Sequence, residues 1–171
     1  MTLAIAHRDK QRAILDAVRE FRPPFAPDNV TSDFCHLLKT YRVHKVQGDR
    51  YGGEWPRERF KRHGVTYETV EQPKSDLYRD LLPALNSGKV DLLDIQRLQL
   101  QFCGLERRTR VGGKDAIDHG PGAHDDIANA AAGALVMALS GAKALNTTQR
   151  TLQMAALPSR ASRYRQPRPF F

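Results

Sequence analysis

Residues 124 to 135 read His-Asp-Asp-Ile-Ala-Asn-Ala-Ala-Ala-Gly-Ala-Leu, which places two adjacent carboxylates at the start of a run of small residues. The apolar periodicity predicts a helix over about residues 125–139. An acid at the first turn is common, because it caps free backbone N–H groups and is favoured by the helix dipole. A second acid beside it, preceded by His124, also gathers the oxygen ligands that hold hard divalent cations. A capped helix and a metal site, which Asp118 and His119 just upstream could help to orient, are both open interpretations.

A further acid, Asp49, follows residues 43–48, which read as a short strand. In open α/β sheets, residues just beyond the C-terminal ends of strands tend to be functional. Phosphodiester hydrolysis by two metal ions needs several carboxylates that converge on ions about 4 Å apart. Asp49, together with Asp125 or Asp126, could supply two of these ligands. The alternative is a turn in which Asp49 caps residues 50–52.

Hydrophobic periodicity predicts alternating strands and helices along most of the chain. The expected strands are 3–7, 13–18, 43–48, 65–70 and 89–93. The expected helices are 30–41, one from 55, 75–85, 95–105 and 125–139, and residues 107–118 are expected to form a two-stranded ribbon. The first two strands form a hairpin, and the order of the elements indicates an α/β fold, a mixed sheet flanked by helices.

The composition suits one domain with a core of ordinary size, since the chain has 171 residues. No apolar run approaches the roughly 20 residues of a membrane span. The N-terminus lacks the basic start and apolar stretch of a signal peptide. Cys35 and Cys103 fall in apolar helical patterns outside any metal-type cluster, so both are expected to be buried free thiols in a reducing cytoplasm.

Positive charge is concentrated at the C-terminus of the chain. Residues 150–171 contain five arginines and no acid, and so supply five of the eight net positive charges. Prolines in this segment oppose a helix. We therefore expect a domain over residues 1–145 and a flexible basic tail over residues 146–171. The tail favours a polyanionic partner such as DNA, with a merely solubilising tail as the alternative.

A second basic run lies in the expected ribbon. Its cationic residues are Arg107, Arg108, Arg110 and Lys114, around a glycine turn. Such a ribbon could grip a phosphate backbone, and a solvated hairpin is the alternative.

Five short motifs occur in a fixed order along the chain. They are Gly48-Asp49-Arg50-Tyr51-Gly52-Gly53-Glu54-Trp55-Pro56, Pro73-Lys74-Ser75-Asp76-Leu77-Tyr78, Leu85-Asn86-Ser87-Gly88, Leu105-Glu106-Arg107-Arg108 and His124-Asp125-Asp126. Together they resemble the C-terminal nuclease domain of the large terminase subunit of tailed phages and prophages, over most of residues 1–140. The resemblance implies an RNase H-like (resolvase-like) fold, Mg²⁺ or Mn²⁺ with two ions in the intact site, and endonucleolytic cutting of concatemeric DNA during genome packaging. It also implies double-stranded DNA, the ATPase domain, the portal and the small terminase subunit as partners, in the cytoplasm of a bacterial host.

By motif, Asp49 matches the second acidic position of the family. The His124-Asp125-Asp126 motif contains the last one, with Asp126 favoured as the main ligand and Asp125 close by. The family carries another Asp on a strand that would precede residues 3–7, and that strand and the ATPase domain are absent from this sequence. We therefore expect a terminase-type nuclease without its first strand, either impaired or inactive in cutting.

Two other functions remain open. One is a non-catalytic DNA-binding or packaging-assembly module that acts through Arg107, Arg108, Arg110 and the arginine tail. The other is a resolvase-like enzyme that acts on branched DNA.

Overall fold

The computed structural model describes residues 1–49, 53–109 and 115–141. The basic tail predicted for residues 146–171 lies outside this range, as do Arg110 and Lys114 of the predicted DNA-binding ribbon.

A long hairpin lies at the centre of the fold. Strands β1 (Thr2–Asp9) and β2 (Arg12–Glu20) pair antiparallel, and the tight turn between them places Lys10 at a positive φ of 52°. The short strand β5 (Val90–Asp91) adds to β2 in parallel, which gives the order β1-β2-β5. The sheet is therefore mixed, as predicted.

Two further pairs of strands stand beside this sheet. Strands β3 (Lys45–Gly48) and β4 (Thr66–Thr69) pair in parallel, and helix α2 (Trp55–Arg62) connects them. Strands β6 (Leu105–Thr109) and β7 (Asp115–His119) form the predicted antiparallel ribbon.

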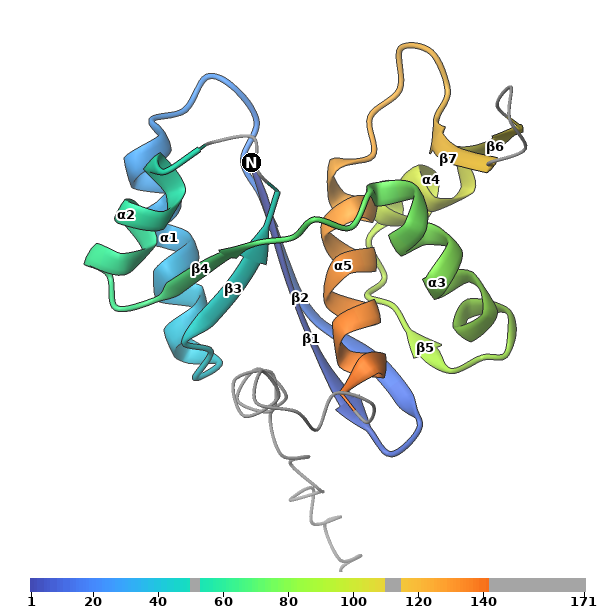
Figure 1. Cartoon of the computed structure of the whole chain (residues 1–171), viewed down its shortest axis with the longest axis horizontal. Helices are drawn as coiled ribbons and strands as arrows, with labels where there is room; N and C mark the ends of the chain where they lie inside the picture. Colours follow the sequence, from blue (N-terminus) through green and yellow to red (C-terminus); the bar gives the residue numbers. More distant parts are fainter. Residues whose placement is uncertain (50–52, 110–114, 142–171) are drawn as a thin grey trace, which may run out of the picture.

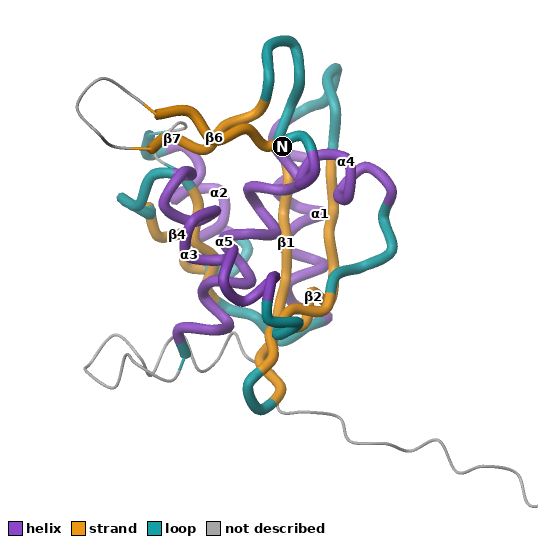
Figure 2. Tube along the Cα trace, turned by 90° about the vertical axis from the view of Figure 1, so that its right-hand side faces the viewer, coloured by secondary structure: helices purple, strands orange, loops and turns teal. Residues whose placement is uncertain are grey.

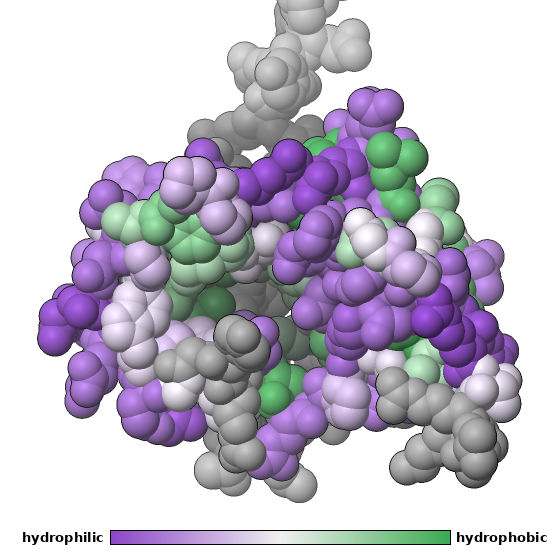
Figure 3. Space-filling view, turned by 90° about the horizontal axis from the view of Figure 1, so that it is seen from above, coloured by the Kyte–Doolittle hydropathy of each residue, from purple (hydrophilic) through white to green (hydrophobic). Residues whose placement is uncertain are grey.

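Within the described ranges, β1 pairs only with β2 and β3 pairs only with β4, so the two sheets are not joined by a strand ladder. Seen from above, the surface is hollowed between the half that contains α2 and the half that contains α5 (Figure 3).

Helices cover both faces of the hairpin. Helix α1 (Pro27–Thr40) lies on one side with α2, whereas α3 (Lys74–Asn86), α4 (Gln96–Cys103) and α5 (Asp126–Ser140) lie on the other (Figure 1). Figure 2 shows the hairpin from the side of α5, which crosses in front of β1. None of the described helices has both the length and the hydropathy of a membrane span.

The hairpin separates two hydrophobic cores. Leu3 and Ile5 of β1 pack with α1 and α2, while Ala4 and Ala6, which point the other way, pack against the core around α5. On α5, the buried residues are mostly alanines, and their small side chains let the helix lie directly on the hairpin. This packing holds the first turn of α5 at the same end of the molecule as the last residue of β3 (Figure 1).

The predicted strands and helices are all present, with boundaries that differ by a few residues. The prediction that both cysteines are buried is wrong for one of them: Cys35 is buried in α1, whereas Cys103 is exposed at the last position of α4. Helix α4 buries Leu98 and Gln101 instead, and it ends before the helix expected from the sequence. The thiol of Cys103 consequently lies at the solvent-facing end of the helix.

Candidate metal site at the start of helix α5

Asp125 precedes α5 at the N-cap position, but its side chain makes no capping hydrogen bond. The carboxylate is 8% exposed and is turned toward α3. There its Oδ2 accepts hydrogen bonds from the Tyr78 hydroxyl at 2.9 Å and the Lys74 ammonium at 3.1 Å. The capping role considered for this residue is therefore replaced by a buried contact with a neighbouring helix.

The free N–H groups of α5 are capped by a side chain from another helix. The Gln101 amide oxygen, on α4, accepts hydrogen bonds from the backbone N–H groups of Ile127 at 2.9 Å and Ala128 at 3.0 Å. This long-range cap releases the Asp125 carboxylate from the helix end. Asp125 is thereby available for the polar cluster between α3, β7 and α5.

Lys74 is the centre of that cluster. Its ammonium also donates to Asp118 Oδ1 at 2.6 Å, so it bridges carboxylates from β7 and from the start of α5. Burial by itself lowers the pKa of Lys74, but its hydrogen bonds to Asp118 and Asp125 outweigh this effect, and the pKa is raised. The same hydrogen bond from Lys74 lowers the pKa of Asp118. Burial, reinforced by the nearby Asp125 charge, raises the pKa of the Tyr78 hydroxyl, which stays protonated and serves as a donor.

His119 completes one side of the cluster. Its Nδ1 donates to the Gly120 carbonyl oxygen at 2.9 Å, because a carbonyl can only accept. The neutral ring therefore carries its lone pair on Nε2, which lies 3.7 Å from Asp118 Oδ1 and 4.0 Å from Asp125 Oδ1. The ring nitrogen suited to ligation or proton acceptance faces the carboxylates.

The two other predicted ligands are exposed. Asp126 is the first residue of α5 and points into solvent, in contrast to its buried neighbour Asp125. Asp49 is exposed directly after β3, where its backbone carbonyl accepts a hydrogen bond from the Tyr67 hydroxyl at 2.8 Å. The roles of Asp49, Asp125 and Asp126 as metal ligands stay predictions.

The fit of this site to a divalent ion is partial. Over residues 1–49, 53–109 and 115–141, no three His, Cys, Asp or Glu side chains are grouped closely enough to hold a metal. Two carboxylates, those of Asp118 and Asp125, do converge on one cation, the Lys74 ammonium. Mg²⁺ commonly takes only one or two protein carboxylates, together with waters and substrate phosphates. The donor chemistry therefore suits one such ion more readily than two.

No role for Lys74, Tyr78 or Gln101 was predicted from the sequence. Lys74 and Tyr78 lie in one of the family motifs, and Lys74 carries a further signal. It is the first residue of α3, where the helix dipole disfavours a cation. A lysine at that position indicates an anionic neighbour, and the structure supplies two.

The described part of the predicted DNA-binding ribbon is exposed. Arg107 and Arg108, which point to opposite faces of β6, are both exposed. The Arg108 guanidinium donates to the Glu106 carboxylate at 2.6 and 3.1 Å, so part of its charge is already matched. DNA binding by this ribbon stays a prediction.

Neither a protein-family model nor a curated protein sequence matches this chain. Its fold is similar to two solved structures, the large terminase nuclease from the thermophilic phage G20c and that nuclease with bound cobalt. The TM-scores are 0.61 and 0.62 at 15% and 14% sequence identity, and each comparison covers 80% of this chain and 80% of the other. The chain therefore has the RNase H-like α/β fold of phage large-terminase nuclease domains, as its motifs predicted.

Proposed function

We propose that this chain is a divalent-metal-dependent DNA endonuclease domain of the large-terminase type, which cuts concatemeric DNA as a phage or prophage genome is packaged. The observation that carries the proposal is the shared fold, in which the first turn of α5 presents Asp125 and Asp126. Cobalt bound to one of the similar nucleases supports a divalent cofactor. For this chain we propose Mg²⁺ or Mn²⁺, because all the acidic candidates offer hard oxygen ligands.

We assign the metal to the start of α5, with Asp125 and Asp126 as ligands and Asp49 as the third candidate, which over the described residues is not grouped closely enough with them to complete a site. A bound divalent ion would supply an activated water and would stabilise charge on the leaving oxygen. Tyr78 holds Asp125 Oδ2 by a hydrogen bond and so fixes the direction in which Oδ1 points. His119 Nε2, near that oxygen, is placed to accept a proton from a water in the site.

The position of Lys74 favours weak rather than efficient cutting. Its ammonium already contacts Asp118 Oδ1 and Asp125 Oδ2, so it offsets part of the negative charge that would attract a metal ion and repels an ion bound at the other oxygen of Asp125. The same observation favours a second candidate function, a DNA-binding or packaging-assembly module that does not cut. Such a module would bind DNA in a salt-sensitive manner without any divalent ion.

Nicking of supercoiled plasmid in Mn²⁺ separates the two functions. We would compare the unmodified chain with Asp49→Asn and with the double variant Asp125→Asn/Asp126→Asn. Asp28→Asn is the matched control, because this exposed carboxylate lies on α1, on the opposite side of the hairpin. The nuclease proposal expects nicking that is lost in the double variant and retained in the control.

Each other outcome has a definite meaning. Nicking that survives the double substitution removes the assigned site. An absence of nicking by the unmodified chain, combined with DNA binding in EDTA, supports the non-cutting module. Nicking that is lost in the double variant but unaffected by Asp49→Asn limits the site to the first turn of α5.

A further inference from the structure

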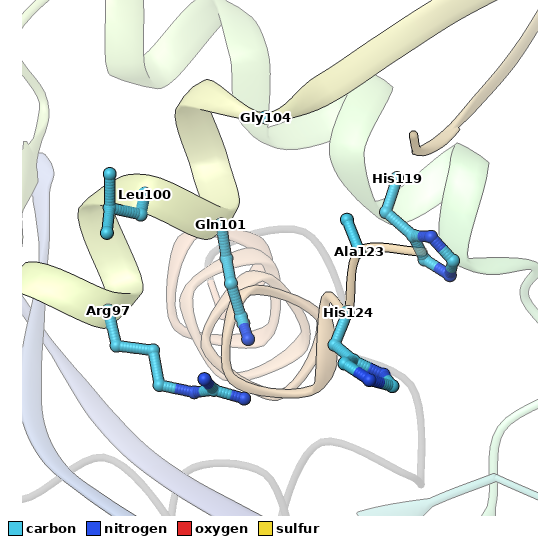
Figure 4. A pocket seen from close by; sticks show the side chains of 7 residues that line it. All are labelled: Arg97, Leu100, Gln101, Gly104, His119, Ala123 and His124. Atoms are coloured by element: carbon cyan, nitrogen blue, oxygen red, sulfur yellow. The ribbon is translucent and has the colours of Figure 1, made fainter. Parts of the chain in front are cut away.

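A pocket of about 290 Å³ opens beside the first turn of α5 (Figure 4). One wall comes from α4, through Arg97 and Gln101, and the other comes from the loop before α5, through His124. His119 also lines it, and this ring has its Nε2 4.0 Å from Asp125 Oδ1, so the pocket adjoins the proposed metal site.

The amide nitrogen of Gln101 is the unusual group in this pocket. Gln101 is 8% exposed, and its oxygen accepts from the N–H groups of Ile127 and Ala128. Because both partners are donors, the amide oxygen must face them and the nitrogen must face away. That nitrogen is buried and has no hydrogen-bond partner among the described residues. Buried donors are nearly always paired in proteins, so this one indicates a missing acceptor.

Two other nitrogen-bearing side chains lie around the same point. In Figure 4, the terminal nitrogens of Arg97 and the His124 ring lie on either side of the Gln101 amide nitrogen. The Glu20 carboxylate lies 3.3 Å from Arg97 Nε and so helps to fix the position of the guanidinium. The pocket also lies at the N-terminus of α5, the positive end of the helix dipole. The Gln101 amide nitrogen, the Arg97 guanidinium and the N-terminus of α5 therefore supply hydrogen-bond donors and positive charge around this space.

A ligand that matches these donors must carry several acceptor oxygens and negative charge. Asp125 and Asp126 nearby weaken the binding of a free anion without preventing it, because Lys74 offsets the charge of Asp125. A phosphodiester satisfies both conditions, because its oxygens only accept and its attachment to a polymer adds binding from other contacts.

We propose that this pocket binds a phosphate group, and that in the complex with DNA it holds a backbone phosphate near the one to be cut. The assignment to DNA rests on the proposed function, whereas the phosphate site itself does not. Gln101 then has two roles, since its oxygen caps α5 and its nitrogen binds the phosphate.

The matched variants follow from this division of roles. Gln101→Glu keeps an oxygen for the N–H groups of α5, so the helix stays capped, and it replaces the donor with an acceptor that also adds a negative charge. Gln99→Glu makes the same change on the exposed face of α4 and is its control. Arg97→Gln removes the guanidinium, and Arg79→Gln removes an equal charge from an exposed position on α3.

The experiment uses the full chain in EDTA, so that no cutting occurs. Inorganic phosphate and then a DNA duplex are titrated while the side-chain amide signals of Gln101 are followed by NMR, and duplex affinity is measured by fluorescence anisotropy over a range of salt. We expect both ligands to shift the Gln101 signals and Gln101→Glu to weaken duplex binding about tenfold, the effect of one lost charged hydrogen bond. We expect Arg97→Gln to lower the slope of log affinity against log salt by about 1. Both controls should behave as the unmodified chain does, and thermal melting should verify that each variant is folded.

The outcomes separate this inference from the nuclease proposal. Shifts with inorganic phosphate alone retain a small-anion site and overturn its assignment to DNA. No shift with either ligand, or a Gln101→Glu variant that is folded and binds DNA normally, overturns the inference, even if the chain nicks plasmid. Binding that behaves as expected in a chain that never nicks plasmid supports the phosphate site and removes the nuclease.

Discussion

The hydrogen bond from Tyr78 to Asp125 provides a sharp test of the polar cluster. Tyr78→Phe removes one hydroxyl oxygen and leaves the ring, which is 4% exposed in the core around α5, in place. The change therefore opens almost no cavity and isolates the hydrogen bond. The lost bond is 2.9 Å long and has a carboxylate as its acceptor.

The expected loss in the free energy of unfolding depends on the hydrogen-bond donors that the Asp125 carboxylate keeps after the substitution. Hydrogen bonds to charged groups contribute about 1.5–3 kcal/mol to the free energy of unfolding. Asp125 Oδ2 keeps its second donor, the Lys74 ammonium at 3.1 Å, so the oxygen is not left unpaired. We therefore expect the lower end, about 1.5 kcal/mol, which for a chain of this size lowers Tm by about 3–6 °C.

Urea unfolding followed by circular dichroism measures this difference directly. Tyr41→Phe is the matched control, because the Tyr41 hydroxyl makes only a long bond of 3.4 Å to the uncharged backbone carbonyl of Asp16. It should change the free energy of unfolding by less than about 0.5 kcal/mol, below the usual range for a net hydrogen bond. Equal effects of the two substitutions would refute the reasoning, because they would mean that the contact with Asp125 adds nothing.

Three further results are expected. Lys74→Met should destabilise the fold more at pH 6 than at pH 3, as measured by urea unfolding. The hydrogen bond from Lys74 depresses the pKa of Asp118 in the folded state. The stability that the ionised Asp118 adds is therefore present above its unfolded pKa and is lost as the pH falls through its folded pKa. A penalty independent of pH would contradict this account. Leu81→Ala should lower the free energy of unfolding by about 2–5 kcal/mol, because the side chain is fully buried, whereas the same change at the exposed leucine that follows it should have little effect. In the native protein a thiol reagent should modify Cys103 rapidly and Cys35 only on unfolding, because Cys35 is buried and its burial raises its pKa to about 11; prompt modification of two thiols would show that the core around α1 opens readily.

The order and type of the elements could be predicted because local patterns dominate there. Apolar residues alternate in β1 and β2, as expected for strands, and the apolar residues of α5 recur with a helical period. In each case the element that forms is the one that this local pattern indicates. The predicted burial of Cys103 was wrong because it depends on where α4 ends and on which side of the helix faces the core. Local sequence patterns determine helix ends poorly.

The site could be predicted only in part. The sequence predicted that Asp125 and Asp126 lie at the start of a helix, and the structure places them there, but which carboxylate is buried depends on contacts from α3 and α4 that are distant in the chain. The sequence does contain one indication of the role of Gln101. This residue lies three positions after the buried Leu98, on the inner face of α4, where a polar side chain needs a hydrogen-bond partner. The bridging position of Lys74 between two carboxylates depends on β7 and α5 meeting α3, and no local pattern encodes that arrangement.

The hairpin that divides the two cores also determines how the protein opens. Each core can loosen by itself at the surface farthest from the hairpin, but the amides that join β1 to β2 near the buried Leu3, Ile5 and Leu15 are covered on both faces. Their hydrogen exchange should require the loss of both cores and so report the global free energy of unfolding. The helices on either side should exchange through smaller, separate openings. Helix α5 packs on this slow-exchanging element, but its first turn is held by Tyr78 of α3 and Gln101 of α4, so an opening of either outer helix should loosen the acids before the hairpin exchanges.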